Sequence, residues 1–209
     1  MFAILNGPRA GSHLLRSLLD SHPDLTCHDE ILGLRKHEHN FYKLGANEGC
    51  LVAYSNLIFN HEMASGNDIE RLLEILRNVP VIHLIRDVGE RARSQFFYAK
   101  TKQRLPLAFR KANLDSPIAL DPEPAGFYDD GIVDVLKTRF VHEKNLCLTQ
   151  FELLRIPWLE ITYDWLCGNE EISELPVEKA SVLCRYLGVA EQALQTTLYK
   201  TRKFDRMET

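Results

Sequence analysis

Short apolar runs alternate along this chain with segments whose apolar residues recur at helical spacing. The runs have the length and composition of buried strands, and they occupy residues 2–5, 25–27, 51–59, 80–85 and 158–162. Apolar residues three or four positions apart predict helices at residues 12–21, 68–77, 90–102, 132–154 and 177–187. This alternation is typical of a mainly parallel sheet covered by helices on both faces. We therefore expect a three-layer α/β fold.

Composition and charge favour one globular domain spanning residues 1–209. The sequence is 45% hydrophobic and 26% charged, and its formal net charge is −4. A negative net charge gives no general attraction for nucleic acid or anionic membranes, so any anion site must be made locally. Residues 101–131 hold four of the nine prolines and interrupt the regular alternation. We expect a mobile substrate loop there.

The five cysteines are scattered and form no CxxC pair. This pattern favours a reducing compartment and argues against both a disulfide framework and a zinc site. No apolar run approaches the roughly 20 residues of a membrane span, and the first residues are typical of a core strand rather than a leader. We therefore expect a cytoplasmic protein without a metal.

Residues 7–12, Gly-Pro-Arg-Ala-Gly-Ser, lie between the first predicted strand and the first predicted helix. There the backbone N–H groups and the positive end of the helix dipole face outward, which suits an anion. Gly7 and Gly11 let the backbone approach an anion closely, and Arg9 adds positive charge. Ser12 is placed to cap the helix and to bind the ligand. The Walker A pattern GxxxxGK[ST] is absent, which disfavours a P-loop nucleotide kinase. A tight structural turn with a surface arginine explains the loop alone equally well.

A second polar cluster follows the strand at residues 80–85. Arg86 stands at the end of that strand, and Ser94 lies eight residues later in the next predicted helix. An arginine fork and a hydroxyl can hold one phosphate together. Taken alone, Arg86 followed by Asp87 is explained more simply by a structural ion pair. Ligands of parallel sheets bind at the carboxyl ends of the strands, so the two clusters are expected to converge.

These segments together resemble the PAPS-dependent sulfotransferases, which take a sulfuryl group from 3′-phosphoadenosine-5′-phosphosulfate (PAPS). The resemblance is closest to tyrosylprotein sulfotransferases and bacterial carbohydrate sulfotransferases of the Nod-factor type. It includes the order and spacing of the motifs, and it is carried by residues 8–12 with 14–24, residues 81–87 with Ser94, residues 159–166 and residues 186–189. It implies a P-loop-like version of the three-layer fold, with PAPS as donor and PAP as product.

The resemblance also implies roles for individual residues. The 5′-phosphosulfate would be held by Arg9, Ala10, Gly11, Ser12 and His13. The 3′-phosphate would be held by Arg86 and Ser94, and closed over by Arg202 and Lys203, although a basic terminus is also commonly just solvated. The catalytic set would be Glu30 as general base, Arg9 as stabiliser of the leaving oxygens and Ser12 as guide for the leaving phosphate.

Some assignments stay open. His28 and His61 are alternative candidates for the general base. Asp29 is next to Glu30, but in an extended segment its side chain is expected to point in another direction. Glu30 is also placed to cap a helix. Ala10 replaces the serine or threonine of the related loops.

The third strand carries Ser55 or Asn56 where related enzymes have a lysine, unless Lys43 or a lysine of residues 100–111 takes its place. A non-catalytic PAPS- or PAP-binding protein is therefore the alternative to an active enzyme. Residues 33–50 and 101–131, which are expected to face the acceptor, have no counterpart in the family and do not identify it. A carbohydrate or small metabolite is the expected acceptor, because no secretory anchor is found in the sequence. No oligomeric state is predicted.

Overall fold

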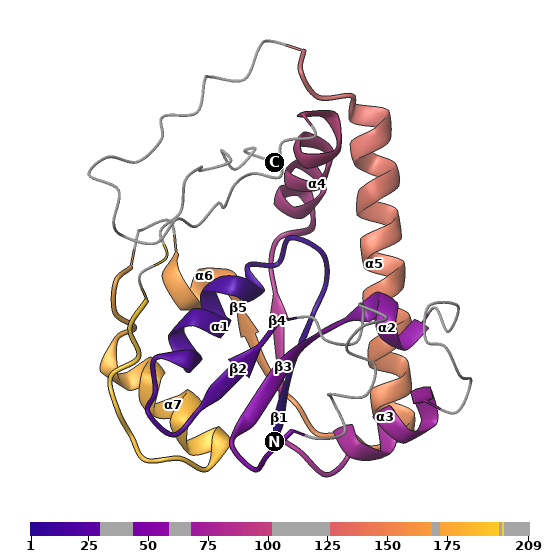
Figure 1. Ribbon diagram of the computed structural model, residues 1–209. Coiled ribbons are helices and arrows are strands. Elements are labelled where there is room, and N and C mark those ends of the chain that lie inside the picture. Colours follow the sequence, from indigo (N-terminus) through magenta and orange to yellow (C-terminus); the bar gives the residue numbers. More distant parts are fainter. Residues whose placement is uncertain (30–43, 59–67, 102–125, 169–171, 197, 199–209) are drawn as a thin grey trace.

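The computed structural model describes residues 1–29, 44–58, 68–101, 126–168, 172–196 and 198, and it has a parallel sheet at its centre (Figure 1). The strand order is β2-β3-β1-β4-β5, and every neighbouring pair in the sheet is parallel. The strands are β1 (Phe2–Asn6), β2 (Thr26–His28), β3 (Glu48–Ala53), β4 (Val81–Ile85) and β5 (Leu159–Thr162). The predicted α/β class with a parallel sheet is confirmed.

Helices cover both faces of the sheet (Figure 1). The described helices are α1 (Ser12–Asp20), α2 (Tyr54–Ile58), α3 (Asp68–Leu76), α4 (Val88–Thr101), α5 (Asp130–Leu153), α6 (Tyr163–Cys167) and α7 (Val177–Leu187). Phe2 and Ile4 of β1 pack with side chains of α1, α6 and α7 in one buried cluster. Ala3 and Leu5 pack with α2, α3 and α5 in another. This alternation along a single strand produces the three layers, because successive strand side chains point to opposite faces.

The predicted strand at residues 51–59 is wrong in its second half. β3 ends at Ala53, and the chain turns directly into α2. The Asn56 side-chain oxygen accepts a hydrogen bond from the Ala53 N–H at 2.9 Å, which fixes the turn. Tyr54 and Leu57 are buried on one side of this short helix. A continuous apolar run does not distinguish a buried strand from a buried helix, so the sequence pattern was ambiguous at this point.

All five strands deliver the chain to the same edge of the sheet. The turn at residues 7–11 leaves β1 there, and Arg86 follows β4 at the same edge. Above this edge α4 and α5 pack together through Ala92, Phe96 and Phe140 (Figure 1). The predicted loop at 101–131 falls between α4 and α5, and its residues 102–125 lie outside the described residues.

The five cysteines are buried and free of disulfides. In the described parts of the chain, no group of three or more His, Cys, Asp or Glu side chains is arranged to hold a metal ion. None of the helices in those parts combines the length and apolar character needed to cross a membrane.

A buried histidine of β4 contacts one side chain of α2 and one of β5. His83 of β4 is fully buried, and its Nε2 lies 2.6 Å from the Tyr54 hydroxyl, while its Nδ1 lies 3.1 Å from a carboxylate oxygen of Glu160. The carboxylate only accepts, so Nδ1 donates to it and Nε2 accepts from the tyrosine. Burial lowers the pKa of His83 to about 4, although Glu160 opposes this shift. The imidazole is therefore neutral near pH 7.

We predict that His83 makes the fold less stable in mild acid. The folded-state pKa of about 4 lies below the ordinary value of 6.5, so the unfolded chain binds the proton more readily. The contribution of His83 to the free energy of unfolding is fully present above pH 6.5. It is lost as the pH falls from 6.5 towards 4, by about 3 kcal/mol at most. Denaturant unfolding of wild type and His83→Gln across this range measures the difference. The control is His142→Gln, an exposed histidine of α5. Equal pH slopes for wild type and His83→Gln would refute this prediction.

Candidate anion-binding site

The turn between β1 and α1 has a left-handed backbone at two positions. Arg9 has φ 63° and Gly11 has φ 92°. Gly11 is the N-cap of α1, and its carbonyl accepts the Leu14 N–H at 3.0 Å. The prediction that Ser12 caps the helix is wrong, because the turn requires a left-handed residue directly before the helix and glycine adopts that conformation at least cost. Ser12 is instead the first residue of the helix, where backbone N–H groups have no partner within the helix.

Both glycines of the loop are required by their close neighbours. A Cβ atom on Gly7 would overlap the guanidinium of Arg91, and one on Gly11 would overlap the ring of Tyr163. The loop is therefore packed against α4 on one side and against the end of β5 on the other. The two glycines are predicted from the sequence to admit an anion, and the described neighbours that require their small size are side chains of this chain.

Arg9 connects the loop to the second predicted cluster. Its Nε donates to the Ser94 hydroxyl on α4 at 3.0 Å, across 85 positions of sequence. Its guanidinium carbon lies 5.5 Å from the centre of the Tyr98 ring. Burial lowers the pKa of Arg9, and the nearby charge of Arg86 lowers it further. A second positive charge next to a desolvated arginine is unfavourable, so the pair favours an anion between or beside them.

Arg86 is held in place by three contacts. Its Nε donates to a carboxylate oxygen of Glu90 at 2.7 Å, and its Nη1 donates to the Arg9 carbonyl at 3.5 Å. Its guanidinium carbon lies 4.5 Å from the centre of the Tyr163 ring. The structural pair considered from the sequence, Arg86 with Asp87, is not found among the described residues. Arg86 pairs with Glu90, and Asp87 accepts the Glu90 N–H directly before α4. Arg86 is thus oriented before any ligand binds.

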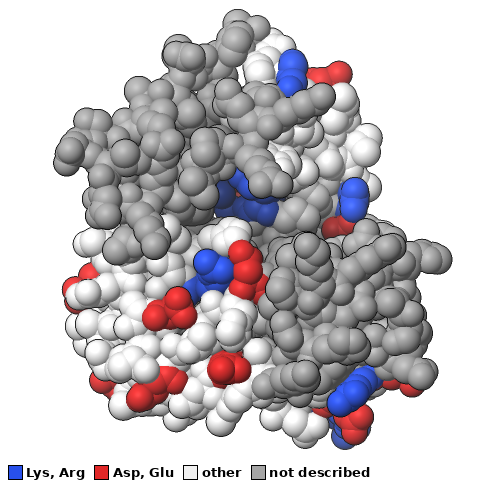
Figure 2. All heavy atoms as spheres, in the orientation of Figure 1, with Lys and Arg blue, Asp and Glu red and all other residues white. Residues whose placement is uncertain are grey.

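Several arginines lie around the turn between β1 and α1. Figure 2 shows Lys and Arg side chains near the centre of this face, with acidic side chains beside them. Arg9 belongs to the loop, and Arg86 and Arg91 donate to loop carbonyl groups. The chain has a net charge of −4, so this concentration of arginines is local, as an anion site in an acidic protein must be.

The structure brings together most of the predicted phosphate ligands that it describes. The loop, β4 and α4 converge to place Arg9, Ala10, Gly11, Ser12, Arg86 and Ser94 around one turn. His13 is more peripheral, with its Nδ1 4.0 Å from Asp29 Oδ1, while Asp29 Oδ2 lies 3.2 Å from an Arg16 nitrogen. Burial lowers the pKa of His13, and Asp29 opposes the shift. Asp29 therefore flanks the first turn of α1.

Several predicted residues lie outside the described residues, namely Glu30, His61, Lys43, Arg202, Lys203 and the lysines of 102–111. Lys100 is described, and its ammonium group donates to the Phe127 carbonyl at 2.8 Å.

His28 lies 3.9 Å from Glu48, which begins β3 at the opposite edge of the sheet, so His28 is turned away from the loop. Asn56 is used in the β3–α2 turn.

Sequence reasoning missed two residues that shape the site, Arg91 and Glu90. Both lie on α4, and Arg91 is three positions before Ser94. Residues three or four apart share a helix face, so helical spacing counted from Ser94 was the available signal for Arg91. Arg86 lies two positions before the start of α4, and its partner Glu90 is four positions further along the chain.

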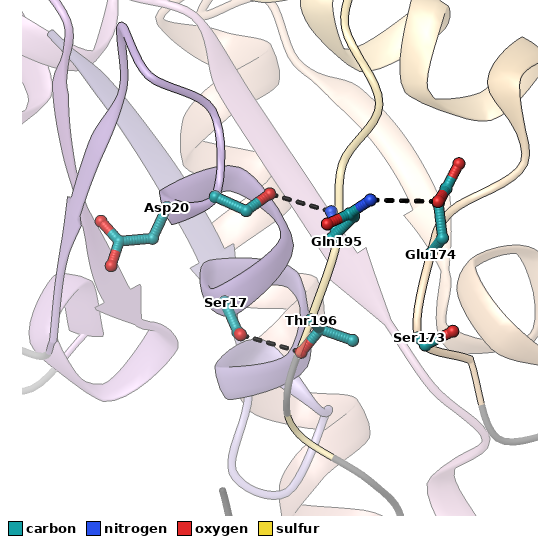
Figure 3. Close-up of a pocket in the computed structure, with 7 residues that line it drawn as sticks. Ser17, Asp20, Ser173, Glu174, Gln195 and Thr196 are labelled. Atoms are coloured by element: carbon teal, nitrogen blue, oxygen red, sulfur yellow. Dashed lines mark hydrogen bonds between the residues drawn. The ribbon is translucent and has the colours of Figure 1, made fainter. Parts of the chain in front are cut away.

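A separate groove of about 480 Å³ lies beside the second half of α1 (Figure 3). It is lined by Ser17, Asp20, Ser21, Ser173, Glu174, Gln195 and Thr196. The Ser17 and Thr196 hydroxyls are 2.8 Å apart, and the Gln195 amide donates to Glu174 at 3.1 Å. Its ionisable side chains are both carboxylates, so this groove is unsuited to a phosphate or sulfate.

Comparison with protein-family models found no match to this chain, and comparison with curated proteins found none either. A function therefore has to be inferred from the side chains around the loop, together with the motifs in the sequence.

We predict that Gly11→Ala destabilises the protein more than a matched glycine replacement. Gly188, which ends α7 with φ 71°, has open space where a methyl group would be added, with no neighbouring atom within 4 Å, so Gly188→Ala reports the backbone cost alone. We expect about 1 kcal/mol for Gly188→Ala and about 2–4 kcal/mol for Gly11→Ala, because the Tyr163 ring must also move. Denaturant unfolding measures both variants. Equal losses would show that Tyr163 does not confine the loop.

Proposed function

We propose that this protein is a PAPS-dependent sulfotransferase that moves a sulfuryl group from PAPS to an acceptor hydroxyl. The observation that supports this best is the hydrogen bond from Arg9 to Ser94, with Arg86 contacting the Arg9 carbonyl. It joins the two sequence motifs that resemble the 5′-phosphosulfate and 3′-phosphate motifs of that family. Two adjacent cationic groups at the carboxyl edge of a parallel sheet suit a nucleotide that carries phosphates at both ends of its ribose.

In this proposal the loop binds the 5′ end of the donor. The N–H groups at the start of α1 and the Arg9 guanidinium are hydrogen-bond donors for the phosphosulfate oxygens. Arg86 and Ser94 bind the 3′-phosphate, which requires Ser94 to share or exchange its present contact with Arg9. Glu90 and Tyr163 hold the Arg86 guanidinium in a fixed orientation for this role. Rigid helix and strand ends supply all these groups, as precise positioning requires.

The proposed reaction is an in-line displacement at sulfur. The acceptor oxygen forms a bond to sulfur as the bond from sulfur to the 5′-phosphate oxygen breaks, and the departing PAP carries the negative charge. Arg9 and the loop N–H groups stabilise that charge as it develops, and Ser12 guides the leaving phosphate. Glu30, the carboxylate that the resemblance implies as general base, takes the proton of the hydroxyl. We propose a carbohydrate or small-metabolite acceptor and a cytoplasmic location.

A PAPS- or PAP-binding protein without transferase activity is the second candidate. One contact favours this candidate. Asn56 lies near the position of the lysine in related enzymes, and its side-chain oxygen accepts a hydrogen bond from the Ala53 N–H. Ser55 lies in the same short helix. This candidate has the same nucleotide site as the enzyme and differs only in lacking turnover.

We predict that PAP binds to the wild-type protein and that Arg86→Ala weakens this binding about 10- to 100-fold, the loss expected for a charged hydrogen bond. Calorimetric titration measures both. Arg185→Ala is the control, since it removes an exposed arginine of α7 that pairs with Glu191. ATP with magnesium is expected to bind weakly, because the loop has no Walker lysine. A folded wild-type protein that does not bind PAP would rule out the sulfotransferase proposal.

We predict further that PAP is released from PAPS in the presence of a suitable hydroxyl acceptor, and that Glu30→Gln slows this release at least about 100-fold with PAP affinity unchanged. Chromatographic separation of PAPS and PAP during a screen of sugars and small metabolites measures turnover. PAP binding without turnover across a broad acceptor screen would favour the non-catalytic candidate. Turnover unchanged in Glu30→Gln would exclude Glu30 as the base.

A further inference from the structure

Arg91 is buried beside the loop, and the sulfotransferase resemblance assigns it no role. Only 3% of its surface is exposed, which is unusual for an arginine. Its Nε donates to the carbonyl of Pro8 at 3.0 Å, so α4 is tied directly to the turn between β1 and α1. It lies on the helix face that also carries Ser94, three positions further along.

Neighbouring aromatic rings restrict the orientation of the Arg91 guanidinium. Its central carbon lies 4.6 Å from the centre of the Phe140 ring and 6.0 Å from that of Tyr54. Burial lowers the pKa of Arg91, while Tyr54 and the buried carboxylate of Glu143 oppose that shift. Its Nη2 has no hydrogen-bond partner among the described residues and lies where a side chain on Gly7 would begin. Gly7 is therefore the residue that makes room for Arg91.

The hydrogen bond to Pro8 has a geometric consequence for the next residue. In a trans peptide the C=O and the following N–H point in opposite directions, and the described chain has no cis peptide bond. A Pro8 carbonyl held towards α4 therefore directs the Arg9 N–H away from α4. The left-handed conformation of Arg9 then brings the chain round to Gly11 and the start of α1.

We propose that Arg91 is the positioning residue of the anion loop. It acts through the Pro8 carbonyl, aiming the Arg9 N–H at the 5′-phosphate of the bound nucleotide, and does not contact the ligand. This rests on the proposed function, because it takes the loop as the 5′-phosphate subsite. Arg86 and Ser94 form the other subsite and bond to Glu90 and Arg9, whereas the Nε of Arg91 bonds to Pro8.

This role gives Arg91 a ligand-specific effect that separates it from a residue that only supports the fold. Loss of Arg91 weakens binding of the 5′-phosphate and leaves the 3′-phosphate subsite intact. Adenosine 3′-monophosphate lacks the 5′-phosphate and otherwise matches PAP. The ratio of the two affinities therefore measures the 5′ subsite alone, and a general loss of structure lowers both affinities together.

The experiment is calorimetric titration of PAP and adenosine 3′-monophosphate into wild type, Arg91→Gln, Arg91→Lys and the control Arg185→Gln. We expect Arg91→Gln to bind PAP at least about 10-fold more weakly and to bind adenosine 3′-monophosphate within about two-fold of wild type. Lysine keeps the charge but lacks the planar guanidinium that donates to Pro8 and lies over the Phe140 ring, so Arg91→Lys is expected to rescue little. Arg185→Gln is expected to match wild type for both ligands.

A second variant covers the case in which Arg91 replacements fail to fold. Gly7→Ala retains the arginine and displaces its guanidinium, so it is expected to lower the affinity ratio in the same direction. An unchanged ratio in the folded variants, or an equal loss for both ligands, overturns the positioning role while the sulfotransferase proposal stands. Absence of PAP binding by the wild type overturns the proposed function itself, and the role of Arg91 with it.

Discussion

Two arginines from the end of β4 and the start of α4 hold the turn between β1 and α1 by its carbonyl groups. Arg86 reaches the Arg9 carbonyl from the end of β4, and Arg91 reaches the Pro8 carbonyl from α4. Each guanidinium lies against an aromatic ring, Tyr163 for Arg86 and Phe140 for Arg91. The carboxylates of Glu90 and Glu143 partly offset the resulting crowding of positive charge. The turn, and with it the direction of its N–H groups, depends on these contacts.

The sheet makes this arrangement possible. β1 lies at its centre, between β3 and β4, so the turn that follows β1 is flanked by chain ends from both neighbours. Buried side chains on both faces of β1 fix its register, and the turn therefore begins from a rigid point. The first turn of α1, the Arg9 side chain and the hydroxyl of Ser94 then meet above one sheet edge. Fixed donors around a local positive charge are what binding and transfer of a phosphosulfate require.

Much of this could be predicted from the sequence. The alternating pattern predicted the α/β class, and helical spacing predicted α1, α3 and α7 to within about one residue of their bounds. Motif order placed Arg9, Arg86 and Ser94 together. The β3–α2 junction was missed because both elements are buried and equally apolar. The burial of Arg91 depends on how α4 packs on α5, where its guanidinium lies over the Phe140 ring, and spacing along the chain does not encode that packing.

The central claim is that the turn after β1 binds the nucleotide, and backbone amide resonances test it most directly. Titration of isotopically labelled protein with PAP is expected to shift the N–H signals of Gly11, Ser12 and His13 in the loop and first turn of α1, together with that of Ser94. The same titration is expected to leave the signals of Ser17 and Gln195, in the acidic groove, unchanged. Shifts confined to that groove, or no shift in the loop at saturating PAP, would contradict the account.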